Sequence, residues 1–384
     1  MPINNQNGDI YFEFWGEDNG MRYYIGKNYT TEENINIYGN EIYSIDANTN
    51  WNYHDSIIIN YNDDINILSM NSKNLDYINL KDMSISSGAT TSLIGSHSRD
   101  PSYRNCLIKL QNGNYLSSII LHGTFSHIIH IAIFDITSNN INNFEKIKKI
   151  DDKWVGYMNS TSCFQTESTY IQCSFSNAVP SNYFTVGIYD LNLNEIETIH
   201  FGYLKDYTFT KIFHIKGEIG AYIFFDDRDG KVPKLFIKKL IDNVLYDVFP
   251  FSYIILNADG LYTLDTSLFG SDAIKINESK FVVILTIKDT YDLLLCLFDF
   301  YNNDSSLRIR YYLLQLSTIN INISVSLRTF IFRGNFGLAF YDSYSRYPRF
   351  IFFNYPTIIS TNKKKSDIIE INLFTTSPES YSFN

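Results

Sequence analysis

The stretch that decides the fold is NYLSSIILHGTFSHIIHIAIFDITSNN, residues 114–140. It reads as a run of strand-forming residues, a short polar turn, a second such run that ends in aromatic-Asp, and an Asn-rich turn. The same order recurs in TYIQCSFSNAVPSNYFTVGIYDLNLNE, residues 169–195, and in KFVVILTIKDTYDLLLCLFDFYNND, residues 280–304. Three copies of one β-rich unit predict a repeat protein built from antiparallel hairpins.

Weaker copies extend this repeat over the chain, beginning near residues 9, 56, 218 and 334. Successive units are spaced roughly 45 to 65 residues apart, which is typical of a four-stranded propeller blade with a long loop. The sequence therefore predicts an all-β fold, a single β-propeller domain over residues 1–384 with seven blades of four antiparallel strands. Six blades are the alternative, and two stacked β-sandwich domains are the rival architecture. Residues 360–384 are expected to hold a ring-closing strand and a tail.

Turn signals separate the runs. Asn112-Gly113 and Asp229-Gly230 are typical of tight hairpin turns, because Asn, Asp and Gly tolerate positive φ. Asp135, Asp190 and Asp299 each follow an aromatic residue at the end of a run. Because the pattern repeats, we expect these three carboxylates to form structural turns rather than one catalytic set.

Composition favours strands and excludes several partners. Hydrophobic residues make up 45% of the chain and aromatic residues 16%, mostly as Tyr and Phe, so a large core can form. The formal net charge of −10 argues against a nucleic-acid partner, which needs a clustered basic surface. The apolar runs are far shorter than the roughly 18 residues of a membrane-spanning helix, so we expect no membrane span in this chain.

No motif indicates a metal or a cofactor. The densest histidine group is His122, His127 and His130, but the last two are an odd number of residues apart and would point to opposite faces of a strand. DDRDG, residues 226–230, lacks oxygen ligands at both ends of an EF-hand loop and is expected to be a hairpin turn. We therefore expect no metal site and no cofactor.

Two short strings are similar to motifs of carbohydrate-active propellers. SIDANTNW, residues 44–51, resembles the Asp-box turn of sialidase-like propellers, which is a structural turn. SRDPS, residues 98–102, resembles the Arg-Asp-Pro motif of fructan- and arabinan-type glycoside hydrolases. That resemblance implies that Asp100 stabilises an oxocarbenium-like transition state. The nucleophile motif of the fructan-acting enzymes is not matched, because Asn5 stands in place of its carboxylate.

Cys163 and Cys173 lie in STSCFQTESTYIQCSF, residues 160–175. If the chain turns at Ser168, the two cysteines face each other at about 4.5–5.5 Å between Cα atoms, within the range of a disulfide. The sequence predicts this disulfide and hence an oxidising compartment, with two thiols in a reducing cytosol as the alternative. Cys296 is expected to be a free core thiol, whereas Cys106, at a strand start, is not assigned.

These features favour a non-enzymatic binding propeller, an ectodomain or secreted module that recognises a protein or a glycan. The chain has 30 Tyr residues, whose rings supply rigid amphipathic contact area, and it has no complete catalytic set. The expected location is extracellular or at the cell surface, with the cytoplasm as the alternative. The alternative function is a glycoside hydrolase-like propeller, or an inactive descendant of one, that would use Asp100. The ligand-binding residues and the oligomeric state are not predicted.

Overall fold

The computed structural model describes residues 2–4, 10–15, 21–27, 42–46, 56–61, 64–70, 75–79, 85–88, 106–122, 127–135, 146–155, 160–177, 183–203, 210–225, 233–249, 253–256, 264, 271–288, 290, 292–301, 306–314, 323–332, 335–342, 347–353 and 373–375. Side chains are described, with gaps, between residues 106 and 338. Across these ranges every regular element is a strand, and we find no helix with the length and apolarity needed to cross a membrane.

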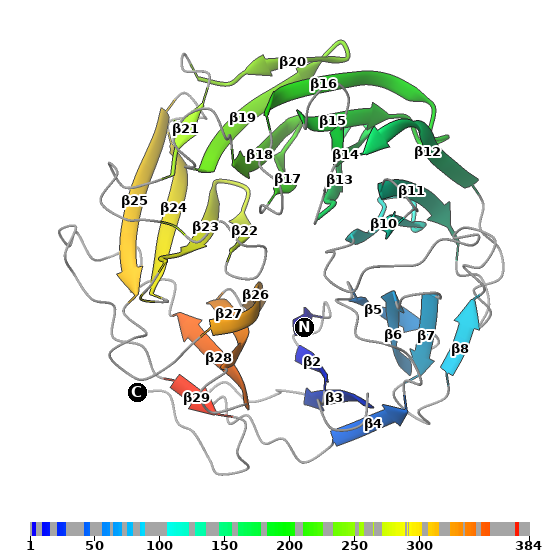
Figure 1. Cartoon of the computed structure of the whole chain (residues 1–384), viewed down its shortest axis with the longest axis vertical. Helices are drawn as coiled ribbons and strands as arrows, with labels where there is room; N and C mark the ends of the chain where they lie inside the picture. Colours follow the sequence, from blue (N-terminus) through cyan, green and yellow to red (C-terminus); the bar gives the residue numbers. More distant parts are fainter. Residues whose placement is uncertain are drawn as a thin grey trace.

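The strands form antiparallel sheets that follow one another along the chain, and Figure 1 shows these sheets arranged around a common centre. Their strands are β1 (Pro2–Asn4), β2 (Ile10–Trp15), β3 (Met21–Lys27) and β4 (Ile42–Asp46); β5 (Ser56–Tyr61), β6 (Asp64–Met70), β7 (Leu75–Asn79) and β8 (Ile85–Gly88); β9 (Cys106–Lys109), β10 (Tyr115–His122), β11 (His127–Phe134) and β12 (Lys146–Val155); β13 (Cys163–Gln165), β14 (Ile171–Asn177), β15 (Tyr183–Tyr189) and β16 (Glu195–Tyr203); β17 (Lys211–Lys216), β18 (Ile219–Phe225), β19 (Pro233–Ile241), β20 (Val244–Asp247) and β21 (Ile254–Ile255); β22 (Asp272–Asn277), β23 (Lys280–Thr286), β24 (Leu293–Tyr301) and β25 (Ser306–Leu314); and β26 (Ile323–Phe332), β27 (Asn335–Asp342), β28 (Tyr347–Phe353) and β29 (Leu373–Thr375).

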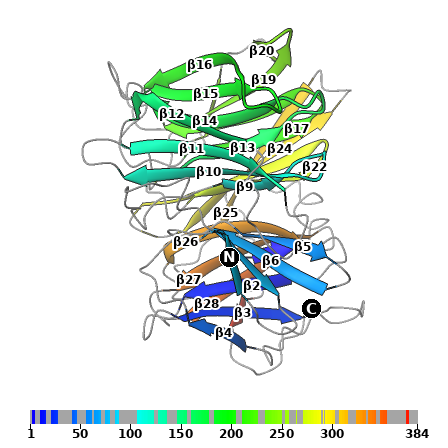
Figure 2. The ribbon, with the colours of Figure 1, turned by 90° about the vertical axis from the view of Figure 1, so that its right-hand side faces the viewer.

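Strand order within each sheet follows the sequence, because each strand pairs with the next one through a hairpin or loop, except that β21 pairs back with β19. The predicted all-β architecture of four-stranded antiparallel sheets is confirmed. The first sheet lies beside the last one, since β1 contacts β26 and Figure 2 shows β2 and β3 next to β27 and β28. β29 pairs with β28, and the described residues include no pairing of β29 with the first sheet. Ring closure by residues 360–384 therefore stays a prediction.

Three hairpin loops share one geometry. In each loop the N–H of the first residue donates to the carbonyl of the fifth, and the N–H of the fourth residue donates back to the carbonyl of the first. The fourth residue has a positive φ, as in a type I turn followed by a left-handed residue. These positions are Gly113 (φ 92°), Thr169 (φ 72°) and Leu193 (φ 57°). The turn predicted at Asn112-Gly113 is confirmed.

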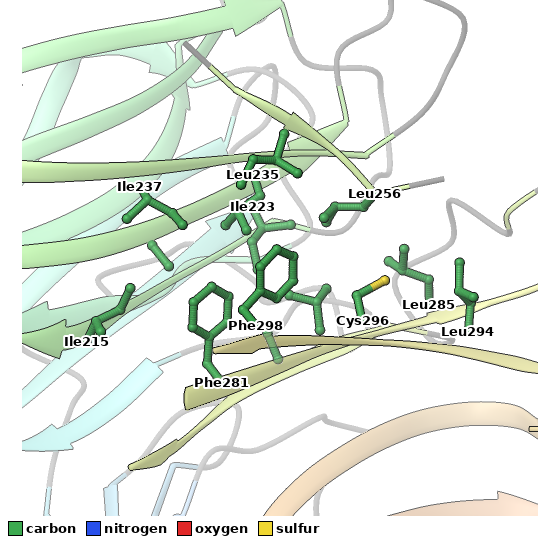
Figure 3. Close-up of a cluster of buried hydrophobic side chains, with 14 of the residues drawn as sticks. Ile215, Ile223, Leu235, Ile237, Leu256, Phe281, Leu285, Leu294, Cys296 and Phe298 are labelled. Atoms are coloured by element: carbon green, nitrogen blue, oxygen red, sulfur yellow. The ribbon is translucent and has the colours of Figure 1, made fainter. Parts of the chain in front are cut away.

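The hydrophobic core lies between neighbouring sheets. Side chains of β9–β11 pack against those of β13–β15, and the opposite faces of β13 and β15 pack against β17–β19. A third cluster joins β17–β19 and β21 to β22–β24, and Figure 3 shows its side chains meeting between the two sheets. Middle strands are thus covered on both faces, which is why they read as continuous apolar runs in the sequence.

Two buried tyrosines fold back over glycines two residues earlier in the same strand. A Cβ on Gly187 would lie 2.7 Å from Cζ of Tyr189, and one on Gly220 would lie 3.0 Å from Cζ of Tyr222. Glycine is required at both positions because the tyrosine ring occupies the space of the missing side chain. Burial raises the pKa of both tyrosines well above the usual value of 10.0.

The carboxylates that follow aromatic residues do not all form turns. Asp190 does, since its Oδ1 accepts hydrogen bonds of 2.8 Å from the N–H groups of Asn192 and Asn194. The expectation for Asp299 is wrong, because β24 continues through it to Tyr301. Pairing of β24 with β25 extends the strand past the point where the turn was expected.

Candidate binding surface

The exposed large hydrophobic side chains of the described residues all lie within one short part of the chain. They are Ile241 (44% exposed), Val244 (46%), Tyr246 (51%), Tyr253 (37%) and Ile255 (51%). We call these five residues the outer-edge patch. They belong to the end of β19, to β20 and to β21 with the residue before it, and Figure 1 places β20 and β21 on the outer side of the molecule.

The outer-edge patch forms because two short strands share the outer side of β19. β20 pairs with β19 from Lys238 to Ile241, whereas β21 pairs with it at Lys234 and Leu235. Asp242 and Asn243 connect β19 to β20 with φ values of 48° and 66°. Two consecutive positive φ values are those of a type I′ turn, which joins antiparallel strands through only two residues.

Both faces of this sheet edge are apolar. Ile241 lies opposite Val244 and therefore on the same face, and Tyr246 shares that face through the period of two along β20. Ile255 lies opposite Lys234, on the other face, together with Tyr253. A ligand lying flat on one face would reach only part of the patch, whereas a ligand at the outer edge reaches both faces.

An aromatic ring and a lysine side chain of β19 pack against one residue of the outer-edge patch. The ring of Tyr253 lies 5.9 Å from that of Phe236, and Nζ of the buried Lys234 lies 4.3 Å from the centre of the Tyr253 ring. Nζ of Lys238 donates to Oδ1 of Asp247 at 3.0 Å and lies 5.7 Å from the centre of the Phe236 ring. The contacts with Phe236 and Lys234 hold the Tyr253 ring in place, so part of the patch is positioned before any ligand binds.

Polar side chains near the centre of the molecule form hydrogen bonds between neighbouring sheets. Oγ of Ser160 and Oγ1 of Thr210 are 2.6 Å apart, across two neighbouring sheets. Nζ of Lys211 donates to Oδ1 of Asp272 at 3.0 Å, while Oδ2 of Asp272 accepts from N and Oγ1 of Thr329 at 2.8 and 2.9 Å. These groups are bonded to one another across sheets, so they act as ties between sheets.

The predicted disulfide is present. Cys163 on β13 lies directly opposite Cys173 on β14, with 4.2 Å between their Cα atoms, and the two sulfurs are bonded. Cys106 and Cys296 are buried and are not part of a disulfide. The expectation of a free core thiol at Cys296 is confirmed, and burial raises its pKa well above the usual value of 9.0.

Other predicted site residues are only partly covered. Asp100 and the rest of SRDPS lie outside the described residues, as does DDRDG, so the glycoside hydrolase hypothesis stays a prediction. His122 lies opposite His127 in the hairpin of β10 and β11, while His130 lies opposite Ile119 and is buried. Within the part of the chain that the structure describes, no group of three or more His, Cys, Asp or Glu could hold a metal ion.

Sequence reasoning missed the outer-edge patch. The dipeptide Asp242-Asn243 between two apolar runs could have indicated the type I′ turn. The exposure of Tyr246 and Ile255 had no such signal, because similar residues elsewhere in the repeat are buried between sheets.

Comparison with known proteins supports the fold alone. No family model matches the sequence, and no curated protein matches it. Among solved structures, the β-propeller domain of the Trilobed protease from Pyrococcus furiosus has a TM-score of 0.50 at 9% identity, covering 98% of this chain and 96% of that one. A lectin from Aleuria aurantia, in complex with α-methyl-L-fucoside, has a TM-score of 0.45 at 10% identity, covering 79% and 91%. This chain, with its antiparallel four-stranded sheets around a common centre, has the β-propeller fold.

Proposed function

We propose that this protein is a non-enzymatic binding propeller that recognises a protein or a glycan through the outer-edge patch. The observation that carries the proposal is the gathering of all five exposed large hydrophobic side chains of the described residues within positions 241–255. Scattered surface apolar residues need no explanation, but a group of them along one sheet edge, here on both of its faces, is typical of an interaction site.

The chemistry of the patch suits recognition. Tyr246 and Tyr253 offer an apolar ring and a hydroxyl, a combination that contributes strongly to both protein and sugar binding. Exposed charged residues adjoin it: Lys239 lies opposite Tyr246, Asp242 follows Ile241 and Asp247 follows Tyr246. An apolar centre with a polar rim is the usual anatomy of a binding surface.

We infer that the supporting ring has seven blades in one domain over residues 1–384. The first strands of neighbouring sheets contact one another in the sequence β1, β5, β9, β13, β17, β22, β26 and back to β1. This series supports ring closure by side-by-side packing of the first and last sheets. The Trilobed protease propeller, which this chain resembles in fold, is itself described as having an open velcro topology.

The disulfide supports a location outside the reducing cytosol. Cys163 and Cys173 are bonded within one hairpin, and such bonds persist in oxidising compartments. We therefore propose a secreted or cell-surface protein.

A binding screen tests the proposed function. The purified protein is applied to a glycan array and to an array of protein ectodomains, and each hit is measured again with Tyr246→Ser and Ile255→Ser. Loss of one hot-spot side chain should lower the affinity at least about tenfold, with an unchanged unfolding midpoint. Glu278→Ser is the matched control, because the Glu278 side chain is 69% exposed in the turn between β22 and β23, on another sheet. Absence of any ligand on both arrays, or hits that both patch variants bind like the unchanged protein, would overturn the proposal.

A further inference from the structure

Three of the four cysteines converge at the interface between two sheets. Cys106 is the first residue of β9, and its sheet packs against the sheet that contains the Cys163–Cys173 disulfide. The N–H of Cys163 donates to Sγ of Cys106 at 3.1 Å, and the same sulfur lies 3.8 Å from the carbonyl oxygen of Cys163. The Cys106 sulfur therefore lies against the main chain of a disulfide-bonded residue.

We propose that Cys106 is an exchange partner of this disulfide, so that the protein can hold a second cross-link, Cys106–Cys163, between the two sheets. In this step Cys106 loses its proton and its sulfur attacks Sγ of Cys163. The Cys163–Cys173 bond breaks, and its electron pair leaves with Sγ of Cys173, which takes up a proton. The exchange consumes no external oxidant or reductant, because one disulfide replaces another.

Covalent geometry supports the pairing. The 3.1 Å contact joins Sγ of Cys106, which is about 2.8 Å from its own Cα, to the backbone nitrogen of Cys163, which is about 1.5 Å from its own Cα. The two Cα atoms are therefore at most about 7.4 Å apart, an upper bound that lies just above the range of about 4.4–6.8 Å that a disulfide spans. Rotation of the two side chains during a local opening of the interface would bring their sulfurs together.

Burial determines when the exchange occurs. Cys106, Cys163 and Cys173 are 6%, 5% and 0% exposed and belong to one core cluster. Ionisation of Cys106 and access of a reductant both require local opening of the sheet interface. The exchange moves the cross-link from within one sheet to between two sheets. Once formed, the new cross-link would hold the two sheets together and prevent their interface from opening again. This inference depends on the cysteines alone and not on the proposed function.

The first test removes the present partner. Cys173→Ala is folded and incubated with oxidised glutathione, alkylated without reduction, and digested with trypsin and a Glu-specific protease. Cleavage at Glu167 separates positions 163 and 173, and trypsin releases Cys106 in the peptide of residues 105–109. We expect that peptide to be linked to the peptide of Cys163 in most molecules. Cys296, buried in a different cluster on β24, is the internal control and should be recovered as a thiol after denaturation.

A second test uses the unchanged protein, in case Cys173→Ala does not fold. The protein is held with a small amount of reduced glutathione, which catalyses exchange, and free thiols are then alkylated in denaturant. We expect part of the label to move from Cys106 to Cys173. If the variant folds, recovery of Cys106 and Cys163 as thiols or as glutathione adducts overturns the proposal. If it does not fold, a label that stays wholly on Cys106 in the unchanged protein overturns it.

Discussion

The carboxylate of Asp272 offers a quantitative test of how the sheets are held together. It is 2% exposed and joins three sheets, because it lies on β22 and accepts hydrogen bonds from Lys211 on β17 and Thr329 on β26. Replacing Asp272 with Ala removes two charge-assisted bonds to Thr329, each worth about 1.5–3 kcal/mol. The bond to the partly exposed Lys211 adds about 0–1 kcal/mol. Because the Ala variant no longer has to bury a charged carboxylate, it avoids that desolvation cost, which offsets part of the lost stability.

We therefore expect Asp272→Ala to lower the free energy of unfolding by about 2–4 kcal/mol, measured by urea unfolding followed through Trp fluorescence. Asp299→Ala is the control. Its ion pair with Lys280 is 3.8 Å long and lies within one sheet, so its loss should cost under about 1 kcal/mol. The reasoning is refuted if both variants lose the same small amount of stability, since Asp272 would then not couple the sheets.

Three further predictions concern the core. Gly187→Ala should destabilise the protein by about 1–3 kcal/mol in urea unfolding, because the new Cβ overlaps the Tyr189 ring; stability equal to that of the unchanged protein would contradict this. Stability should fall as the pH rises above 10, because Tyr189 and Tyr222 ionise in the unfolded chain before they ionise in the core. The expected slope is about 1.4 kcal/mol per pH unit for each ring, and unfolding midpoints that do not change up to pH 11 would disprove it. Peptide mapping without reduction should recover Cys163 linked to Cys173, and alkylation of both thiols would contradict the bond.

Features set by local chain geometry could be predicted from the sequence. A hairpin turning at Ser168 fixes the register of its two strands, so the pairing of Cys163 with Cys173 followed from counting residues. The Asp190 turn was equally predictable, because a carboxylate can bond to N–H groups two and four residues further along the chain without help from the rest of the fold.

Features set by distant partners could not be predicted in this way. Asp299 has the same sequence context as Asp190, yet it lies in a strand because β25 continues to pair with β24 beyond it. The position of Cys106 against Cys163, 57 residues further along the chain, depends on packing between two sheets. The outer-edge patch likewise depends on where the neighbouring sheets end, and the local sequence of residues 241–255 does not reveal this.

In a repeated fold, a residue that recurs in every unit is more readily explained by structure than by a single binding event. Specific function is therefore expected where one unit departs from the others. Among the described sheets, the one built from β17 to β20 is distinguished by a fifth strand, β21, which pairs with β19. The exposed apolar side chains gather on this same sheet, at the edge that β20 and β21 share. The extra strand and the exposed apolar side chains thus lie on the same sheet. Together they favour this edge as the binding site over the hydrogen-bonded polar residues between the inner strands.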